Sequence, residues 1–127
     1  MSSNLKTIYE DKYVTITDCY ILIKKYYIPL MTSKTVLFSE ISSISIEDAS
    51  RVKASWGIDT HHLNNWFQYD PKRKNKPRFI SIEIKKTAIR PAITPEDVDK
   101  CFNALREHFS GIDRKSVMFQ SNRDKET

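Results

Sequence analysis

The stretch TPEDVDKCFNALREHFSG, residues 94–111, shows the clearest change of pattern in the chain. Apolar residues recur in it at intervals of three and four, at Val98, Cys101, Phe102, Leu105 and Phe109. Such intervals put side chains on one face of an α-helix. Thr94 is a good N-cap, Pro95 suits the first helical position, and Gly111 suits the end. The stretch therefore predicts one amphipathic helix whose apolar face packs on a core.

The chain before this helix reads as consecutive strands. Short segments rich in β-branched and aromatic residues, separated by polar turns, are typical of antiparallel strands. In order they are LKTIYE (5–10), YVTIT (13–17), YILIKKYYI (20–28), TVLF (35–38), ISSISIED (41–48), RVKAS (51–55) and FISIEIKK (79–86). In the last segment isoleucines alternate with Phe79, Ser81 and Glu83, which predicts one buried and one mostly polar face. We therefore predict an all-β fold of about seven antiparallel strands with a C-terminal helix.

The length and composition of the chain limit the number of domains, disulfides and membrane segments that we expect. The chain has 127 residues, which suits one domain, residues 1–111, followed by a polar tail, residues 112–127, that we expect to be mobile. Cys19 and Cys101 lie far apart, which is no disulfide framework and fits a reducing compartment. We find no apolar segment of signal-peptide or membrane-spanning length, so we expect a cytoplasmic protein without an integral membrane segment.

Charge and glycine content narrow the classes of ligand. The 21 basic and 16 acidic residues give a formal net charge of +5, which permits an anionic partner without requiring one. Only Gly57 and Gly111 are glycines, so the glycine-rich loops that hold nucleotide phosphates are absent. We expect no cofactor.

The predicted order of elements resembles the pleckstrin-homology-like (PH-like) barrel, in which seven antiparallel strands are capped by a C-terminal helix. More narrowly, the chain is similar to bacterial PH-like proteins of undefined function. The motifs that carry the resemblance are YEDKYVTITDCYILIKKYYIP (9–29), TVLFSEISSISIE (35–47), Trp56-Gly57 followed by Trp66 and D-x-K-R (70–73), and RPAITPEDVD (90–99). The resemblance covers residues 5–110 and implies a fold more than an activity. Its first turn, EDK, has one lysine and lacks the basic loop of lipid-binding PH domains.

Residues 55–78, SWGIDTHHLNNWFQYDPKRKNKPR, show neither a helical nor a strand period. We predict a long ordered loop that Trp56 and Trp66 pin against the open end of the barrel, because exposure of two large aromatic side chains is costly. Asp70 followed by Pro71 predicts a turn within it. Loops of this length are often functional.

A run of basic residues follows the aromatic residues Trp66 and Tyr69. It contains Lys72, Arg73, Lys74, Lys76 and Arg78. Basic side chains beside aromatic ones can bind single-stranded nucleic acid or anionic lipid headgroups, although such runs are often only solvated. Our candidate binding residues are therefore this run together with Trp56, Trp66 and Tyr69.

Metal and catalytic sites are not predicted. Adjacent histidines on an extended segment point in opposite directions, and no cysteine is near them, so we expect no metal bound by Asp59, His61, His62 and Asp70. No serine has a nucleophile-elbow context, Cys19 lacks an activating neighbour, and Cys101 belongs to the predicted helix core. A nucleophile, a base and an orienting group cannot be assembled, so we predict no catalytic residues and no enzyme.

These observations favour a non-catalytic PH-like binding module. Its partner is expected to be a protein or peptide, because an exposed sheet edge can add a strand. The alternative is a weak electrostatic binder of anionic membrane lipid or nucleic acid through residues 72–78. We make no prediction about self-association.

Overall fold

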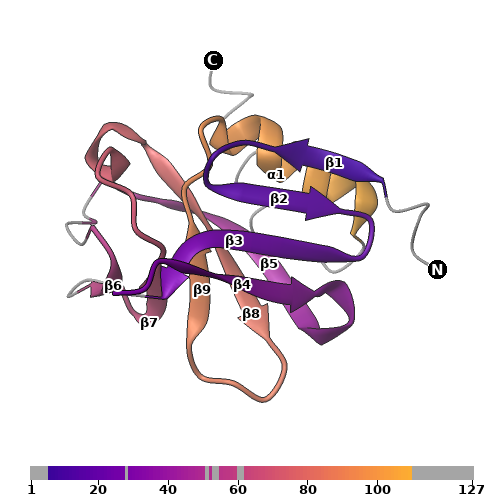
Figure 1. Ribbon diagram of the computed structural model, residues 1–127, viewed down its shortest axis with the longest axis horizontal. Coiled ribbons are helices and arrows are strands. Elements are labelled where there is room, and N and C mark those ends of the chain that lie inside the picture. Colours follow the sequence, from indigo (N-terminus) through magenta and orange to yellow (C-terminus); the bar gives the residue numbers. More distant parts are fainter. Residues whose placement is uncertain (1–5, 28, 51, 53–54, 60–61, 110–127) are drawn as a thin grey trace.

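The computed structural model describes residues 6–27, 29–50, 52, 55–59 and 62–109 (Figure 1). The predicted tail, residues 112–127, lies outside this part. The first sheet contains β1 (Thr7–Glu10), β2 (Val14–Thr17), β3 (Tyr20–Tyr27) and β4 (Thr32–Leu37). The second sheet contains β5 (Ile41–Asp48), β6 (Gly57–Asp59), β7 (His62–Phe67), β8 (Arg78–Ile84) and β9 (Arg90–Ile93). Two 3-10 turns, η1 (Phe38–Glu40) and η2 (Arg73–Asn75), and the helix α1 (Val98–His108) complete the described elements.

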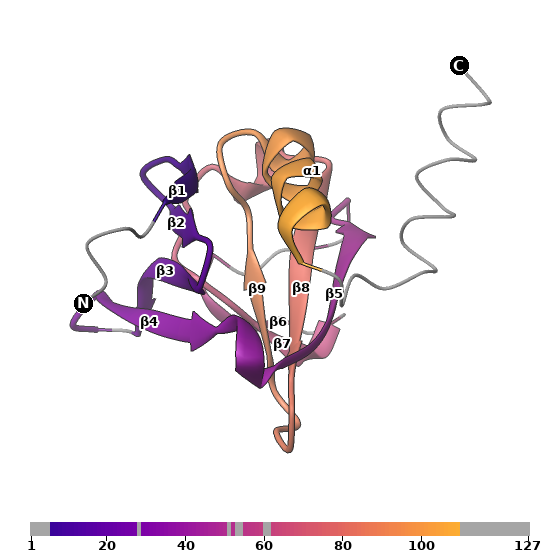
Figure 2. The same ribbon diagram turned by 90° about the vertical axis from the view of Figure 1, so that its right-hand side faces the viewer.

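The two sheets differ in their connections. The first is an antiparallel meander in the order β1-β2-β3-β4, and the second has the order β5-β8-β9-β7-β6. Within the second sheet β5, β8 and β9 form a further antiparallel meander, whereas β7 pairs with β9 in parallel. Helix α1 lies across one end of the sheets, in contact with β1 and β8 (Figure 2). In the described residues the strands form two sheets and not one closed barrel.

Most of the predicted elements are confirmed. The first five predicted strands correspond to β1 to β5, and FISIEIKK corresponds to β8. RVKAS is not confirmed as a strand, because Val52 is not in a strand and residues 51, 53 and 54 lie outside the description. Three strands were not predicted, namely β6, β7 and β9. The expectation of antiparallel pairing throughout was wrong for β7 and β9.

The main core lies between the sheets and α1. The apolar face predicted for the helix is confirmed, since Val98, Cys101, Phe102 and Leu105 are all buried there. Phe109 is only partly buried, and its ring lies 5.3 Å from that of Phe38. Burial of such side chains is the main favourable term in folding, so this face fixes the helix on the sheets.

The predicted helix start was wrong by several residues. Asp97 is the N-cap, and its side chain accepts a hydrogen bond from the backbone N–H of Lys100 at 3.0 Å. Thr94 instead follows directly after β9 and is fully buried. The helix ends at His108, before Gly111, which lies outside the described residues.

Strand β8 is buried on both faces for much of its length, which corrects the prediction of one polar face. Phe79 is 0% exposed and Ser81 is 2% exposed. Phe79 belongs to a second apolar cluster, and its ring lies 4.9 Å from that of Phe67. The other members of this cluster are Ala49, Val52 and Ala92. A second, smaller core therefore covers part of the sheet face that we expected to be solvated.

Among the residues that the structure describes, no helix combines the length and the apolar character needed to cross a bilayer.

Candidate functional site

Residues 55–78 begin with a hairpin and not with the long loop that we predicted. Strands β6 and β7 pair in antiparallel fashion, with Gly57 opposite Phe67 and Ile58 opposite Trp66. Gly57 has φ +78°, a conformation that favours glycine, and the Trp66 ring lies 3.8 Å from the position of a Cβ there. The hairpin is inserted between β5 and β8, which pair with each other. Strand β6 has three residues and β7 contains two adjacent asparagines, a residue type that is depleted in strands, so their local sequence gave no strand signal.

The turn predicted at Asp70 and Pro71 is confirmed, since the Arg73 backbone N–H donates to the Asp70 carbonyl oxygen at 3.2 Å. The side chain of Asp70 is a buried hydrogen-bond acceptor and is 0% exposed. It accepts hydrogen bonds from the Thr94 hydroxyl at 2.5 Å, from the Lys76 ammonium at 2.8 Å and from the Lys72 backbone N–H at 2.9 Å. Burial acts to raise the pKa of Asp70, but the hydrogen bonds from Lys76, Thr94 and Lys72 outweigh it and lower the pKa. Asp70 is therefore ionised at neutral pH and serves as a structural anion.

Lys76 connects the two sheets through this anion. Its Nζ also donates to the Thr94 carbonyl oxygen at 2.6 Å and lies 3.8 Å from the centre of the Tyr13 ring. Tyr13 precedes β2, whereas Thr94 follows β9. Burial and the charge of Asp70 raise the pKa of Tyr13 to about 12. The ammonium is therefore held between a carboxylate, a carbonyl and an aromatic face.

Gln68 and Arg73 extend the same network. The Gln68 Nε2 donates to the carbonyl oxygens of Tyr13 at 2.9 Å and Lys24 at 2.7 Å. Its Oε1 accepts from the Thr94 backbone N–H at 3.2 Å. Arg73 donates to the Gln68 carbonyl oxygen, and its guanidinium lies 4.9 Å from the centre of the Phe67 ring. Hydrogen bonds of this kind satisfy polar groups that would otherwise be costly to bury.

The expected exposed basic run is wrong for three of its members. Arg73 is 2% exposed, Lys76 is bound to Asp70, and Arg78 forms an ion pair with Asp99. Lys72 is exposed, while the side chain of Lys74 lies outside the described residues. The basic residues were read from local sequence as solvated charges. Instead Gln68 and Asp70 of the same stretch bind Arg73 and Lys76, and Asp99 of α1 binds Arg78. Arg73, Lys76 and Arg78 therefore stabilise the fold and do not form a common cationic surface.

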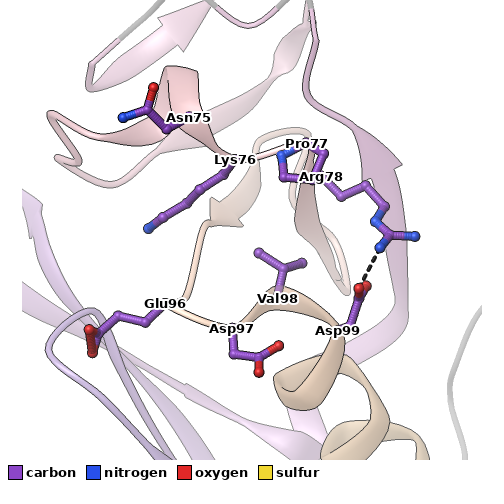
Figure 3. A pocket seen from close by; sticks show the side chains of 8 residues that line it. All are labelled: Asn75, Lys76, Pro77, Arg78, Glu96, Asp97, Val98 and Asp99. Atoms are coloured by element: carbon purple, nitrogen blue, oxygen red, sulfur yellow. Dashed lines mark hydrogen bonds and ion pairs between the residues drawn. The ribbon is translucent and has the colours of Figure 1, made fainter.

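A hollow of about 280 Å³ lies between the start of β8 and the start of α1 (Figure 3). It is lined by Asn75, Lys76, Pro77, Arg78, Glu96, Asp97, Val98 and Asp99. Figure 3 shows Arg78 and Asp99 pointing toward each other at one side, while Glu96 points away. Side chains of both charges line the hollow, so it offers no single sign of charge to a ligand.

The two tryptophans behave differently. The Trp66 Nε1–H donates to the Tyr26 carbonyl oxygen at 3.1 Å, and the two rings lie 6.2 Å apart. Trp66 therefore holds β7 against β3, as expected of a pinning residue. Trp56 is 48% exposed and does not cap the sheets, which corrects that prediction. Tyr69 is half-buried, and its backbone N–H donates to the Lys25 carbonyl oxygen at 2.9 Å.

An apolar surface accompanies the open edge of β6. Trp56 directly precedes this strand, and Ile58 within it is 41% exposed. In the described part of the chain, β6 pairs with β7 alone, so its other edge has no neighbour. An edge strand with exposed apolar side chains is a template for pairing with another chain. We name Trp56, Ile58 and the open edge of β6 the edge site.

The two cysteines add no second candidate. Burial raises the pKa of the Cys101 thiol well above its usual range. The pKa of Cys19 is also raised, by desolvation and by its neighbour Asp18. Neither thiol has the lowered pKa of an activated nucleophile.

The metal hypothesis rested on residues that are mostly outside the description. The structure does not describe His61 or the side chains of Asp59 and His62. The carboxylate of Asp70 already binds Thr94 and Lys76. Among the described residues, no group of three or more histidine, cysteine or acidic side chains is placed to hold a metal ion.

Comparison of the chain with protein-family models, with curated proteins and with solved structures found no match.

Proposed function

We propose that the chain is a non-catalytic binding module with a PH-like fold, and that a protein or peptide partner adds a strand at the edge site. The arrangement of strands supports the fold assignment. Two antiparallel meanders, β1 to β4 and β5-β8-β9, provide seven strands, and the helix α1 follows them. In this reading the hairpin β6–β7 is an insertion between the fifth and sixth strands of the PH-like frame.

The buried ionisable groups support a non-catalytic role. A general acid or base works best when its pKa lies near neutral pH. The pKa of Asp70 is lowered, and that of the nearby Tyr13 is raised to about 12. Both shifts move the pKa values of these groups further from neutral pH. Their hydrogen-bond partners are other parts of the chain, which is the pattern of a structural network.

The observation that carries the binding proposal is the exposure of Trp56 and Ile58 beside an open strand edge. A partner strand would gain backbone hydrogen bonds from β6 and apolar contact from these two side chains. Aromatic residues such as tryptophan often carry a large share of binding energy at interfaces. The electrostatic alternative is not proposed for residues 72–78, because Arg73, Lys76 and Arg78 are engaged within the protein.

Selection from a random peptide library displayed on phage tests the proposal. Peptides that bind the wild-type protein are measured again against Ile58→Lys, because a lysine on an edge strand opposes pairing. Ile89→Lys is the matched control, since Ile89 is 42% exposed and lies on the turn between β8 and β9. We expect Ile58→Lys to weaken binding at least about tenfold and Ile89→Lys to leave it unchanged. Equal binding by both variants would refute the edge site.

A further inference from the structure

The hollow between the start of β8 and the start of α1 contains two buried polar atoms without a hydrogen bond. Arg78 and Asp99 form an ion pair there, through the Arg78 Nη2 and the Asp99 Oδ2. Among the residues that the structure describes, neither the Arg78 Nε nor the Asp99 Oδ1 has a partner, although both atoms are buried. Buried polar atoms are nearly always hydrogen-bonded. A donor and an acceptor left free in one ion pair therefore indicate a ligand that both accepts and donates.

The free groups of the hollow differ in charge and come from its two sides. Arg78 lies at the start of β8, whereas Asp97 and Asp99 lie at the start of α1 (Figure 3). Lys76 does not provide a second free cation, because Asp70 binds its ammonium. The Asp97 carboxylate caps α1, and within the described part of the chain no cation forms an ion pair with it. An acceptor oxygen of a ligand is thus matched by Arg78, and an ammonium group by Asp97 and Asp99.

The size and the apolar lining of the hollow limit the ligand to a small molecule. The volume of about 280 Å³ lies just below the range of about 300–1,000 Å³ for ligand pockets. Pro77 and Val98 also line the hollow, and Val98 is 8% exposed. Their side chains give apolar contact to a short aliphatic group. The hollow therefore suits a ligand with two opposite charges and one short aliphatic group.

We propose that the hollow binds a free α-amino acid with a small side chain. In such a molecule the ammonium and the carboxylate are attached to one carbon, which matches a free acceptor and a free donor in one ion pair. The ammonium donates to the Asp99 Oδ1 beside Asp97, and the carboxylate accepts from the Arg78 Nε–H. Hydrogen bonds between ionised groups are stronger than those between neutral groups. The hollow shares no residue with the edge site, so this binding is independent of a partner strand.

Titration of the full chain, followed by its backbone amide chemical shifts, tests the proposal. The probes are glycine, L-alanine, L-serine and L-valine. Ethylamine and propionate are the control ligands, because each keeps only one of the two charges of an amino acid. Asp99→Asn removes the carboxylate charge, and its side chain is 46% exposed, so we expect the variant to fold. Arg78→Lys keeps a cation for the ion pair but lacks the Nε–H. Glu107→Gln is the matched control, since Glu107 is exposed near the opposite end of α1.

We expect at least one of the four amino acids to shift the amides of Val98 and Asp99 at millimolar concentration. Ethylamine, propionate, and the variants Asp99→Asn and Arg78→Lys should each weaken the binding at least about tenfold, whereas Glu107→Gln leaves it unchanged. Melting temperatures show whether the variants are folded, and Arg78→Lys decides if Asp99→Asn is not.

Two results would overturn the proposal. The first is a wild-type protein that none of the four amino acids shifts, as it would be if water satisfied the Arg78 Nε and the Asp99 Oδ1. The second is equal binding of L-alanine by the wild type and a folded Arg78→Lys variant.

Discussion

Replacing Asp70 by asparagine removes a charge from the centre of the polar network while preserving its shape. The carboxylate is 0% exposed and accepts from Thr94, Lys76 and the Lys72 backbone. An amide can satisfy only some of these donors, because its nitrogen is itself a donor. Lys76, whose side chain is 14% exposed, then loses its counter-ion and keeps only the Thr94 carbonyl and the Tyr13 ring.

The size of the effect follows from that geometry. Breaking a buried ion pair by removing one partner costs about 3–5 kcal/mol. Water can still reach part of the Lys76 ammonium, so we expect a loss of about 3 kcal/mol in the free energy of unfolding. For a domain of this size that loss lowers Tm by about 10 °C. Lys76→Met in the Asp70→Asn background removes the unpaired cation and should recover part of the stability, giving a non-additive double-mutant cycle.

The pH dependence of the free energy of unfolding provides an independent test of the role of Asp70. The pKa of Asp70 is lower in the folded protein than the usual pKa of an aspartate side chain. The group therefore contributes stability that is fully present well above pH 3.8 and is lost as the pH falls through the folded pKa. Asp70→Asn should lack this contribution, so the stability difference between wild type and variant narrows as the pH falls below about 4.

Urea unfolding of wild type, the two single variants and the double variant, at neutral and acidic pH, measures these quantities. The slopes of the unfolding curves should agree, which shows that the same surface is exposed. A loss below about 1 kcal/mol for Asp70→Asn, or an additive cycle, would refute the role of Asp70 as the anion that joins the two sheets.

Three further predictions follow from the fold. Phe102→Ala should cost about 3–5 kcal/mol in urea unfolding, because Phe102 is 1% exposed in the main core; a loss under about 1 kcal/mol would contradict that position. Gly57→Ala should cost about 1–2 kcal/mol because of its left-handed backbone, and Gly57→Asn should cost less; equal losses would argue against strain. Purified protein should contain no stoichiometric zinc and should keep its Tm with a chelator, whereas zinc that disappears in His61→Ala would restore the metal hypothesis.

The helix face was predictable because it depends on local spacing. Val98, Cys101, Phe102 and Leu105 are buried as their intervals indicate. The helix start was not predictable, since Thr94 has the side chain of an N-cap but uses it to bind Asp70, 24 positions away in sequence. A capping rule that considers only neighbouring residues does not include a distant partner such as Asp70.

The candidate site was less predictable than the fold, because its properties depend on remote pairings. Arg73, Lys76 and Arg78 have the local sequence of a solvated basic run. Yet Arg73 and Lys76 are bound by Gln68 and Asp70 of the same stretch, and Arg78 is bound by Asp99 of α1. Strand β7 acquires its second neighbour from β9, which follows it by more than twenty residues. Trp56 was expected to cap the sheets, but it is exposed beside the open edge of β6, which its local sequence does not reveal. The neighbouring Ile58 gave no signal in the sequence.

Backbone and indole chemical shifts of the protein, recorded with and without a peptide selected from the library, test the edge site most directly. We predict that the largest changes fall on the amides of Gly57, Ile58 and Asp59 and on the Trp56 indole N–H. The amides of β6 should also exchange more slowly with solvent, because a partner strand would cover the open edge. Shift changes confined to another surface, with β6 unaffected, would contradict the account.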